Sequence, residues 1–323
     1  TWILREFGRR YYENTAYFNF DENEEFKQFF ETTKDVDRIL QNLMLASGQK
    51  ILPEKTLIIF DEVQDCPKVI NSMKYFCENA PQYHIACAGS LLGIALARPS
   101  SFPVGKVNFM QIDPMTFTEF LLANGLNETA IAALRTKFQA RQALDGAMHN
   151  KMMDLFRKYL LVGGLPDAVN AFLETRNIQR VREVQREIHD YYAADASKYD
   201  AGRKLKIRRI YDLIPSNMEN KKKRVVAQQI ENKRGKTFGD YQDEFEYLIS
   251  AGIALNVQAV SNPHFPLAET EGKSLLKLYL NDVGILSALL YGNNIRAILE
   301  DVRSINLGSV YETVVASELA AHG

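Results

Sequence analysis

The first 120 residues alternate between short apolar runs and segments with helical periodicity. Residues 56–60 and 84–89 are apolar almost throughout, and such a lack of alternation indicates strands buried on both faces, as in a parallel sheet. Residues 16–21 and 107–112 are also expected to be strands. Helical patterns over residues 24–45 and 68–79 lie between them. Strands that alternate with helices predict an α/β domain of three layers.

The chain opens on a helical pattern. Apolar residues recur from Trp2 to Phe7, and Gly8 is expected to end this helix. The first residue, Thr1, is not Met and leads straight into the helix. A natural chain rarely begins with its first turn already under way, so we expect further residues before Thr1.

The rest of the chain follows two other patterns. Residues 117–192 are helical with one interruption at Gly163-Gly164-Leu165-Pro166. From residue 205 we expect a helix (207–214), a β-like segment (224–230), a second helix (238–250) and two strands (253–260 and 274–280). This order is typical of a winged helix. The linker between the two patterns is expected near residues 195–203.

These patterns divide the chain into four parts. We expect an α/β core over residues 1–120, a helical lid over 121–200, a winged-helix-like α+β domain over 201–290 and the start of a further domain over 291–323. The 323 residues allow two or three cores, and 46% hydrophobic with 24% charged residues is ordinary for a soluble globular protein.

Charge and cysteine content narrow the possible functions. A net charge of −1 gives the whole molecule no strong attraction to nucleic acid or membranes, so any such attraction must be local. The longest apolar runs are far too short to span a membrane. Three cysteines without C-x-x-C spacing argue against a zinc site and a disulfide framework, and suit a reducing cytoplasm. We therefore expect a cytoplasmic location.

Two carboxylates stand together at the expected end of a buried strand. Asp61 and Glu62 follow the apolar run 57–60. In P-loop ATPases the first such acid holds Mg²⁺ through water and the second orients the attacking water. A buried strand followed by an acidic turn is the alternative, and it is common in α/β proteins.

A polar residue follows the next strand. Ser90 comes directly after the run 84–89, so it could lie beside Asp61 across the strand ends and sense a γ-phosphate. Alternatively, Gly89 and Ser90 form a turn that caps a helix over residues 91–97. Both roles are compatible.

Several motifs in order resemble a widespread prokaryotic family of AAA-type, STAND-like P-loop ATPases with a conserved C-terminal region of poorly understood function. The resemblance covers essentially the whole chain. It rests on F-D-E-V-Q (60–64), A-G-S-L-L-G (88–93), F-P-V-G-K-V (102–107), P-M-T-F-T-E-F-L (114–121) and G-G-L-P-D-A (163–168).

The resemblance implies an ATP and Mg²⁺ site. In that family a G-x-x-x-x-G-K-T loop stands immediately before the helix matched here by residues 2–7, so Thr1 matches its last residue, whose hydroxyl ligates Mg²⁺. Thr1 and Asp61 would serve the metal, Glu62 the water and Ser90 the γ-phosphate. Pro166 would match the proline of a G-x-P element that packs near the adenine, although a helix break alone also explains a proline there.

Other residues carry open alternatives. Lys106 stands where related proteins often have arginine, so it could have a phosphate-sensing or trans-acting role, and a solvated lysine is the plainer interpretation. Asp282 is expected to cap a helix. In the family the helix that includes Glu312 opens a restriction-endonuclease-like fold, but the residues that would complete a nuclease site are not in this sequence.

A basic cluster stands out in a nearly neutral chain. Residues 203–224 hold nine Lys or Arg against two acids, a local charge of about +7 that could contact DNA phosphates or form a solvated face. The members are Arg203, Lys204, Lys206, Arg208, Arg209, Lys221, Lys222, Lys223 and Arg224.

The sequence thus favours an ATP-binding protein that hydrolyses ATP with Mg²⁺, coupled to a C-terminal effector or DNA-binding region. The alternative is a nucleotide-switched DNA-binding or regulatory module without hydrolysis. The oligomeric state is left open.

Overall fold

The computed structural model describes residues 1–89, 105–195, 204–220, 225–260, 264, 271–300 and 306–323. Two compact units make up the chain, Thr1–Gln111 (unit 1) and Ile112–Gly323 (unit 2).

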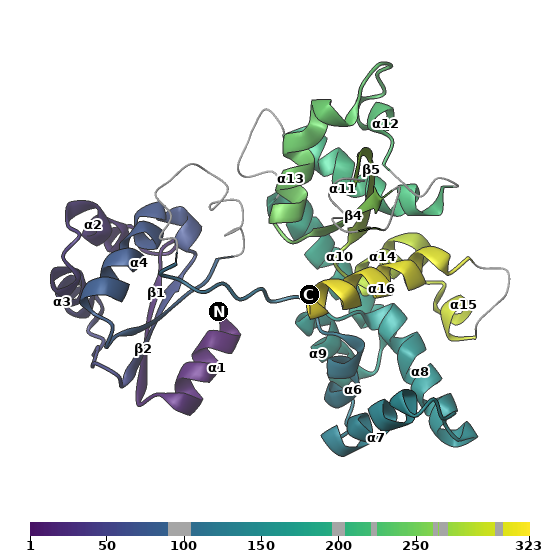
Figure 1. Cartoon of the computed structure of the whole chain (residues 1–323), viewed down its shortest axis with the longest axis horizontal. Coiled ribbons are helices and arrows are strands. Elements are labelled where there is room, and N and C mark those ends of the chain that lie inside the picture. Colours follow the sequence, from purple (N-terminus) through teal and green to yellow (C-terminus); the bar gives the residue numbers. More distant parts are fainter. Residues whose placement is uncertain (90–104, 196–203, 221–224, 261–263, 265–270, 301–305) are drawn as a thin grey trace. The chain divides into compact units, whose positions relative to one another are not determined.

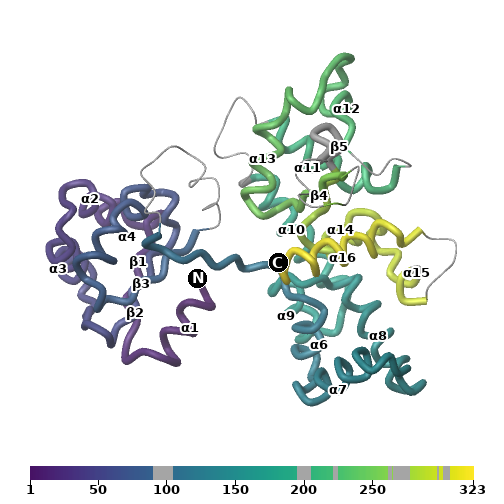
Figure 2. Tube along the Cα trace, viewed as in Figure 1, coloured from purple at the N-terminus to yellow at the C-terminus, as the bar shows by residue number. Residues whose placement is uncertain are grey.

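Unit 1 is built on a parallel sheet of three strands (Figures 1 and 2). The strands β1 (Asn14–Asn19), β2 (Thr56–Asp61) and β3 (His84–Cys87) lie in sequence order, with Asn19 opposite Asp61. The expected α/β class is therefore confirmed. The helices among the described residues of the unit are α1 (Trp2–Tyr11), α2 (Glu24–Thr32), α3 (Val36–Ser47), the 3₁₀ turn η1 (Val63–Asp65) and α4 (Pro67–Asn79).

Strand alternation sorts the side chains of this sheet onto two faces. Phe18, Ile58 and Phe60 lie on one face and pack in a core with residues of α2, α3 and α4. The other face carries Thr15 and Asp61 and is covered by α1, which lies on the opposite side of the strands in Figure 1. The unit thus has three layers, helix, sheet and helices.

Gly8 does not end the first helix, contrary to expectation. Helix α1 continues to Tyr11, and Gly8 is buried in its middle. A Cβ at Gly8 would lie 2.3 Å from Thr15 Oγ1 and 3.2 Å from Leu57 Cδ2. The glycine is therefore used for close approach of helix to sheet and not as a helix stop.

Two further expectations for unit 1 were wrong. The single helix expected over residues 24–45 is two, because Thr33 is extended and Asp35 begins α3 by accepting a hydrogen bond from the Arg38 N–H. Residues 107–112 form no strand. Phe109 and Met110 are 63% and 84% exposed, and no strand of the described residues pairs with this segment. Four apolar residues among these six do not suffice to make a strand.

Unit 2 begins with five helices, so the helical character expected over residues 117–192 is confirmed. They are α6 (Phe117–Ala123), α7 (Glu128–Gln139), α8 (Gly146–Val162), α9 (Pro166–Thr175) and α10 (Ile178–Asp195). After them come α11 (Lys204–Glu219), α12 (Ala227–Glu231), η2 (Phe238–Tyr241), α13 (Gln242–Ser250), β4 (Ala254–Val260), β5 (Glu271–Leu280), α14 (Val283–Tyr291), α15 (Ile295–Leu299) and α16 (Gly308–His322).

The β-like segment expected over residues 224–230 is instead helical from Ala227, where α12 begins. Its buried residues Ala227 and Ile230 are three positions apart, which is the spacing of a helix face and not the alternation of a strand. The helix expected over residues 207–214 extends through Pro215 to Glu219. Strands β4 and β5 form an antiparallel pair after these helices. The winged-helix class stays a prediction.

The larger of two hydrophobic cores among the described residues of unit 2 joins Phe120 and Tyr159 to Ile210 and Leu280, and it reaches Val314 in α16. Residues from all three segments expected after residue 120 thus share a core. The boundaries near residues 200 and 290, and the role of residues 121–200 as a lid, stay predictions. Among the residues that the structure describes, no helix combines the length and apolarity that a membrane crossing requires.

Candidate functional site

Asp61 ends β2 on the face covered by α1. Its side chain is buried, and Oδ2 accepts hydrogen bonds from Thr1 Oγ1 at 2.5 Å and from the Tyr17 hydroxyl at 2.6 Å. Oδ1 accepts from the Glu62 N–H at 3.1 Å. The structure therefore brings together Thr1 and Asp61, the two residues expected to serve the metal.

Glu62 turns the chain away from the sheet. Its backbone is left-handed, with φ 53° and ψ 43°, a conformation that costs a non-glycine residue roughly 1–2 kcal/mol. The side chain is half-buried and bonds to the Gln64 amide. Strained backbone at a strand end is common at functional sites.

The two carboxylates differ in electrostatics. Burial raises the pKa of Glu62, and the negative charges of Asp61, Asp65 and Asp21 act in the same direction. Burial also acts to raise the pKa of Asp61, but hydrogen bonds from Thr1 and Tyr17 outweigh it and the pKa lies below its usual value. The lowered pKa keeps Asp61 ionised, whereas the raised pKa of Glu62 makes its carboxylate a stronger proton acceptor.

The expected neighbour on β3 falls partly outside the described residues. The Ala88 N–H donates to Phe60 O at 2.8 Å, and Ala88 O accepts from the Val63 N–H at 3.1 Å. These bonds tie the chain just after β3 to the end of β2. Ser90 itself lies outside the described residues, so its role stays a prediction.

The chemistry of Thr1 and Asp61 fits Mg²⁺. A hydroxyl and a carboxylate oxygen converge on one point, and Mg²⁺ prefers few protein oxygens, with water and phosphate completing its shell. Among the described residues no group of three or more His, Cys, Asp or Glu side chains could hold a metal by itself. A site that uses nucleotide oxygens needs no such group.

Tyr17 is a member of the site that the sequence interpretation missed. It lies on β1 opposite Ile59, diagonally across from Asp61 and on the same face of the sheet. The Arg5 guanidinium stacks 3.7 Å from its ring centroid. Burial and the Asp61 charge raise the pKa of Tyr17 to about 12, so its hydroxyl stays a donor. Strand alternation over residues 16–21 was the available signal, but the register of β1 against β2 was needed to use it.

Pro166 begins α9 in unit 2, directly after the glycine turn. With Leu165, Asp167, Ile188, Tyr191 and Tyr192 it lines an open pocket of about 350 Å³. Two tyrosines and two aliphatic side chains give the pocket walls suited to a flat ring. Placement of Pro166 against a nucleotide stays a prediction.

The described part of the basic cluster is engaged in contacts within unit 2. Lys206 Nζ lies 4.0 Å from Glu244, Arg208 pairs with Asp212 at 3.8 Å, and Arg209 donates to Ile230 O at 3.4 Å. Outside the described part lie Arg203, the side chain of Lys204 and residues 221–224. DNA contact through the cluster stays a prediction.

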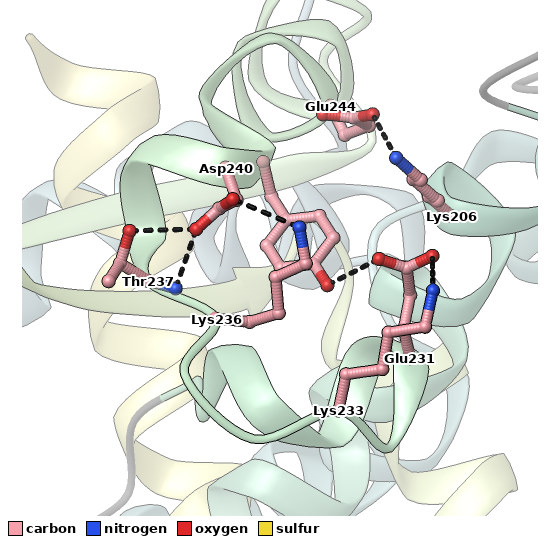
Figure 3. A network of polar contacts seen from close by, with 8 residues as sticks. Lys206, Glu231, Lys233, Lys236, Thr237, Asp240 and Glu244 are labelled. Carbon is pink, nitrogen blue, oxygen red and sulfur yellow. Dashed lines mark hydrogen bonds and ion pairs between the residues drawn. The ribbon is translucent and has the colours of Figure 1, made fainter.

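Figure 3 shows the wider network to which Lys206 belongs. The buried Tyr241 donates to Glu231 at 2.8 Å, and the amines of Lys206 and Lys236 lie 5.7 and 5.8 Å from its ring centroid. Lys236 also bonds to Asp240 at 3.0 Å. These contacts connect α11, α12, η2 and α13 as a structural network.

Other candidates from the sequence also have partners. Lys106 pairs with Glu78 at 3.1 Å. Glu312 of α16 pairs with Lys277 of β5. Asp282 caps α14, as expected, by accepting from the Ile285 N–H at 3.0 Å. The endonuclease-like assignment stays a prediction.

Two family models match parts of the chain. Residues 1–121 match the model described as "AAA domain", and residues 153–296 match one described as "Domain of unknown function (DUF8612)". The first match supports assignment of the N-terminal residues to the P-loop ATPases, and ATP binding with it. No curated protein matches the chain.

Two solved structures are similar in outline. The Walker-type ATPase paby2304 of Pyrococcus abyssi is 12% identical, with a TM-score of 0.47 over 86% of this chain and 84% of that one. The Orc1 protein of Aeropyrum pernix in complex with DNA is 14% identical, with a TM-score of 0.32 over 92% of this chain and 83% of that one. Similarities of this size do not establish a shared function.

Proposed function

We propose that this chain belongs to an enzyme that hydrolyses ATP in the presence of Mg²⁺, with Thr1, Asp61 and Glu62 as the centre of the site. The observation that carries the proposal is the pairing of unlike carboxylates at the end of β2. Asp61 is kept charged by two hydroxyl donors, and its neighbour Glu62 has a raised pKa and a strained backbone.

Each residue then has a separate task. Thr1 Oγ1 and Asp61 would hold Mg²⁺, which when bound neutralises charge on the phosphates. Glu62 would orient a water molecule and accept its proton, a role helped by a pKa closer to neutrality. Tyr17 would keep Asp61 directed toward the metal side. Ser90 would contact the γ-phosphate, as the family resemblance suggests.

The test is release of inorganic phosphate from ATP by the natural protein. Release that requires Mg²⁺ is expected, and its acid limb should lie above the ordinary glutamate pKa of 4.5, because the Glu62 pKa is raised. Tight ATP binding without release would instead favour the nucleotide-switched module.

We further propose that the pocket beside Pro166 receives the base of a nucleotide. Its apolar walls and the two tyrosines would stack on a flat ring, and Asp167 is an acceptor for an exocyclic amine. Tyr191→Ala should then weaken the affinity of the chain for adenosine. Unchanged affinity for adenosine would show that the pocket does not recognise the base.

A further inference from the structure

Asp282 is a buried carboxylate that the proposed reaction does not use. It is 2% exposed and precedes α14. Its two oxygens have different partners: Oδ1 accepts from the Ile285 N–H at 3.0 Å, and Oδ2 accepts from the Gly164 N–H at 2.7 Å. The first bond is an ordinary helix cap. The second joins residues 118 positions apart, at the turn before Pro166.

The turn is shaped around this carboxylate. Gly163 has φ +74°, and a Cβ there would lie 2.2 Å from Asp282 Oδ1. Gly164 is held from the other side, since its carbonyl accepts from the Met115 N–H at 2.7 Å and a Cβ would lie 2.1 Å from Met115 O. The two glycines therefore pack between Asp282 and Met115 with no room for a side chain.

The fixed turn leads directly to the pocket. Leu165 follows Gly164 and lines the pocket, and Pro166, the next residue, begins α9. A shift of the Gly164 backbone would therefore move two wall residues of the pocket.

Burial of an unpaired carboxylate is costly, so its hydrogen bonds are significant. Burial raises the pKa of Asp282, and N–H groups of Gly164, Ile285, Gly284 and Leu165 act against that rise. Capping of α14 needs only one of these bonds, and a serine could provide it.

We propose that Asp282 is a positioning residue for the Pro166 pocket, which fixes the Gly163–Gly164 turn so that the pocket can receive a nucleotide base. The inference rests on the proposed function of that pocket. It assigns to Asp282 a role beyond capping, and it predicts that nucleotide affinity depends on a residue that does not line the pocket.

The test is Asp282→Ser, which keeps an acceptor for the Ile285 N–H but is too short to reach Gly164. Hydrogen exchange should show loss of protection at the Gly164 amide and retained protection at Ile285. ATP affinity should fall by about tenfold, equivalent to about 1.4 kcal/mol. Asp145→Ser is the matched control, because Asp145 caps α8 through the Met148 N–H at 2.9 Å and has no second acceptor role in the described contacts.

A second variant tests the proposal if the serine variant does not fold. Asp282→Asn keeps the side-chain volume and one acceptor oxygen, but its NH₂ group would face one of the two N–H donors. With the helix cap kept, it too should expose Gly164 to exchange and weaken ATP binding.

The Pro166→Ala variant distinguishes failure of the positioning role of Asp282 from failure of the pocket assignment. If Pro166→Ala weakens ATP binding but the folded Asp282 variants do not, the positioning role is overturned and the pocket assignment stands. If Pro166→Ala has no effect, the pocket assignment fails and the positioning role with it. Protection of Gly164 that persists in the Asp282 variants overturns the inference directly.

Discussion

The charged side chains of two regions of this protein have different kinds of partner. Around Tyr241 in unit 2, Lys206, Lys236 and Asp240 have oppositely charged partners (Figure 3). At the end of β2 in unit 1, the carboxylate of Asp61 is held by hydroxyl groups and that of Glu62 by an amide.

The difference supports the proposed site in unit 1. Ion pairs satisfy charge within the fold and leave little for a ligand, whereas neutral donors orient a carboxylate without cancelling its charge. In the proposed site the charge of Asp61 would therefore attract a cation. Burial disfavours the ionised form of Glu62 and so raises its pKa. Four predictions test this contrast.

The largest effect is expected for Glu62→Gln. The amide keeps the size and the contact with Gln64 but cannot accept a proton, so ATP turnover should fall by about 10²-fold or more with ATP binding retained. Phosphate release and fluorescent-nucleotide binding measure the two effects. Glu54→Gln is the matched control, since Glu54 is another left-handed glutamate (φ 60°), exposed before the start of β2, and should keep full turnover. Turnover above a tenth of wild type in Glu62→Gln would contradict the assignment.

Asp61→Asn should weaken Mg²⁺-dependent ATP binding by on the order of tenfold, because a formal charge facing the metal is removed. The remaining oxygen can still accept from Thr1 and Tyr17, so the fold should persist. Titration of Mg²⁺ at fixed ATP measures the effect. Asp35→Asn, which exchanges one good helix cap for another at α3, should leave the Mg²⁺ dependence unchanged. Equal Mg²⁺ dependence in both variants would mean that Asp61 does not face the metal.

Tyr17→Phe removes one hydroxyl donor from Asp61 and keeps the ring against Arg5. Loss of one hydrogen bond of about 1 kcal/mol should reduce Mg²⁺-dependent turnover by about fivefold. Tyr12→Phe is the control, because its hydroxyl bonds to His84 Nδ1 at 2.9 Å and not to the carboxylates. If both phenylalanine variants retain full turnover, Asp61 does not depend on Tyr17 for its orientation.

The sequence was sufficient to predict those features of the fold that depend on a local pattern of residues. The apolar run before Asp61 predicted a buried strand, and the order of elements predicted an α/β sheet with two carboxylates at a strand end. Tyr17 could not be found in this way, because its contact with Asp61 depends on pairing of β1 with β2. The second bond of Asp282 likewise joins residues 118 positions apart, and no local pattern encodes it.

Composition does not reveal contacts. The basic residues after residue 203 suggest a surface for phosphate, which stays a prediction, and within the described part Lys206 and Arg208 pair with acids from α13 and α11. A count of charges along the chain does not reveal which acids the fold brings near. The same limit applies to residues 107–112, which are mostly apolar but pair with no strand of the described residues.

The smallest effect is expected from Lys206→Gln, which separates a structural lysine from a DNA contact. Loss of the pairs with Glu244 and the Tyr241 ring should lower the free energy of unfolding by about 1 kcal/mol. The salt dependence of binding to duplex DNA should not change.

If the basic cluster follows a phosphate backbone, replacement of Lys221, Lys222 and Lys223 with Glu should instead reduce the log–log salt slope by roughly 0.9 for each phosphate that is no longer neutralised. Identical slopes in wild type and both variants would favour a solvated face, whereas a reduced slope in Lys206→Gln would contradict its structural role. Neither result bears on the carboxylates of unit 1.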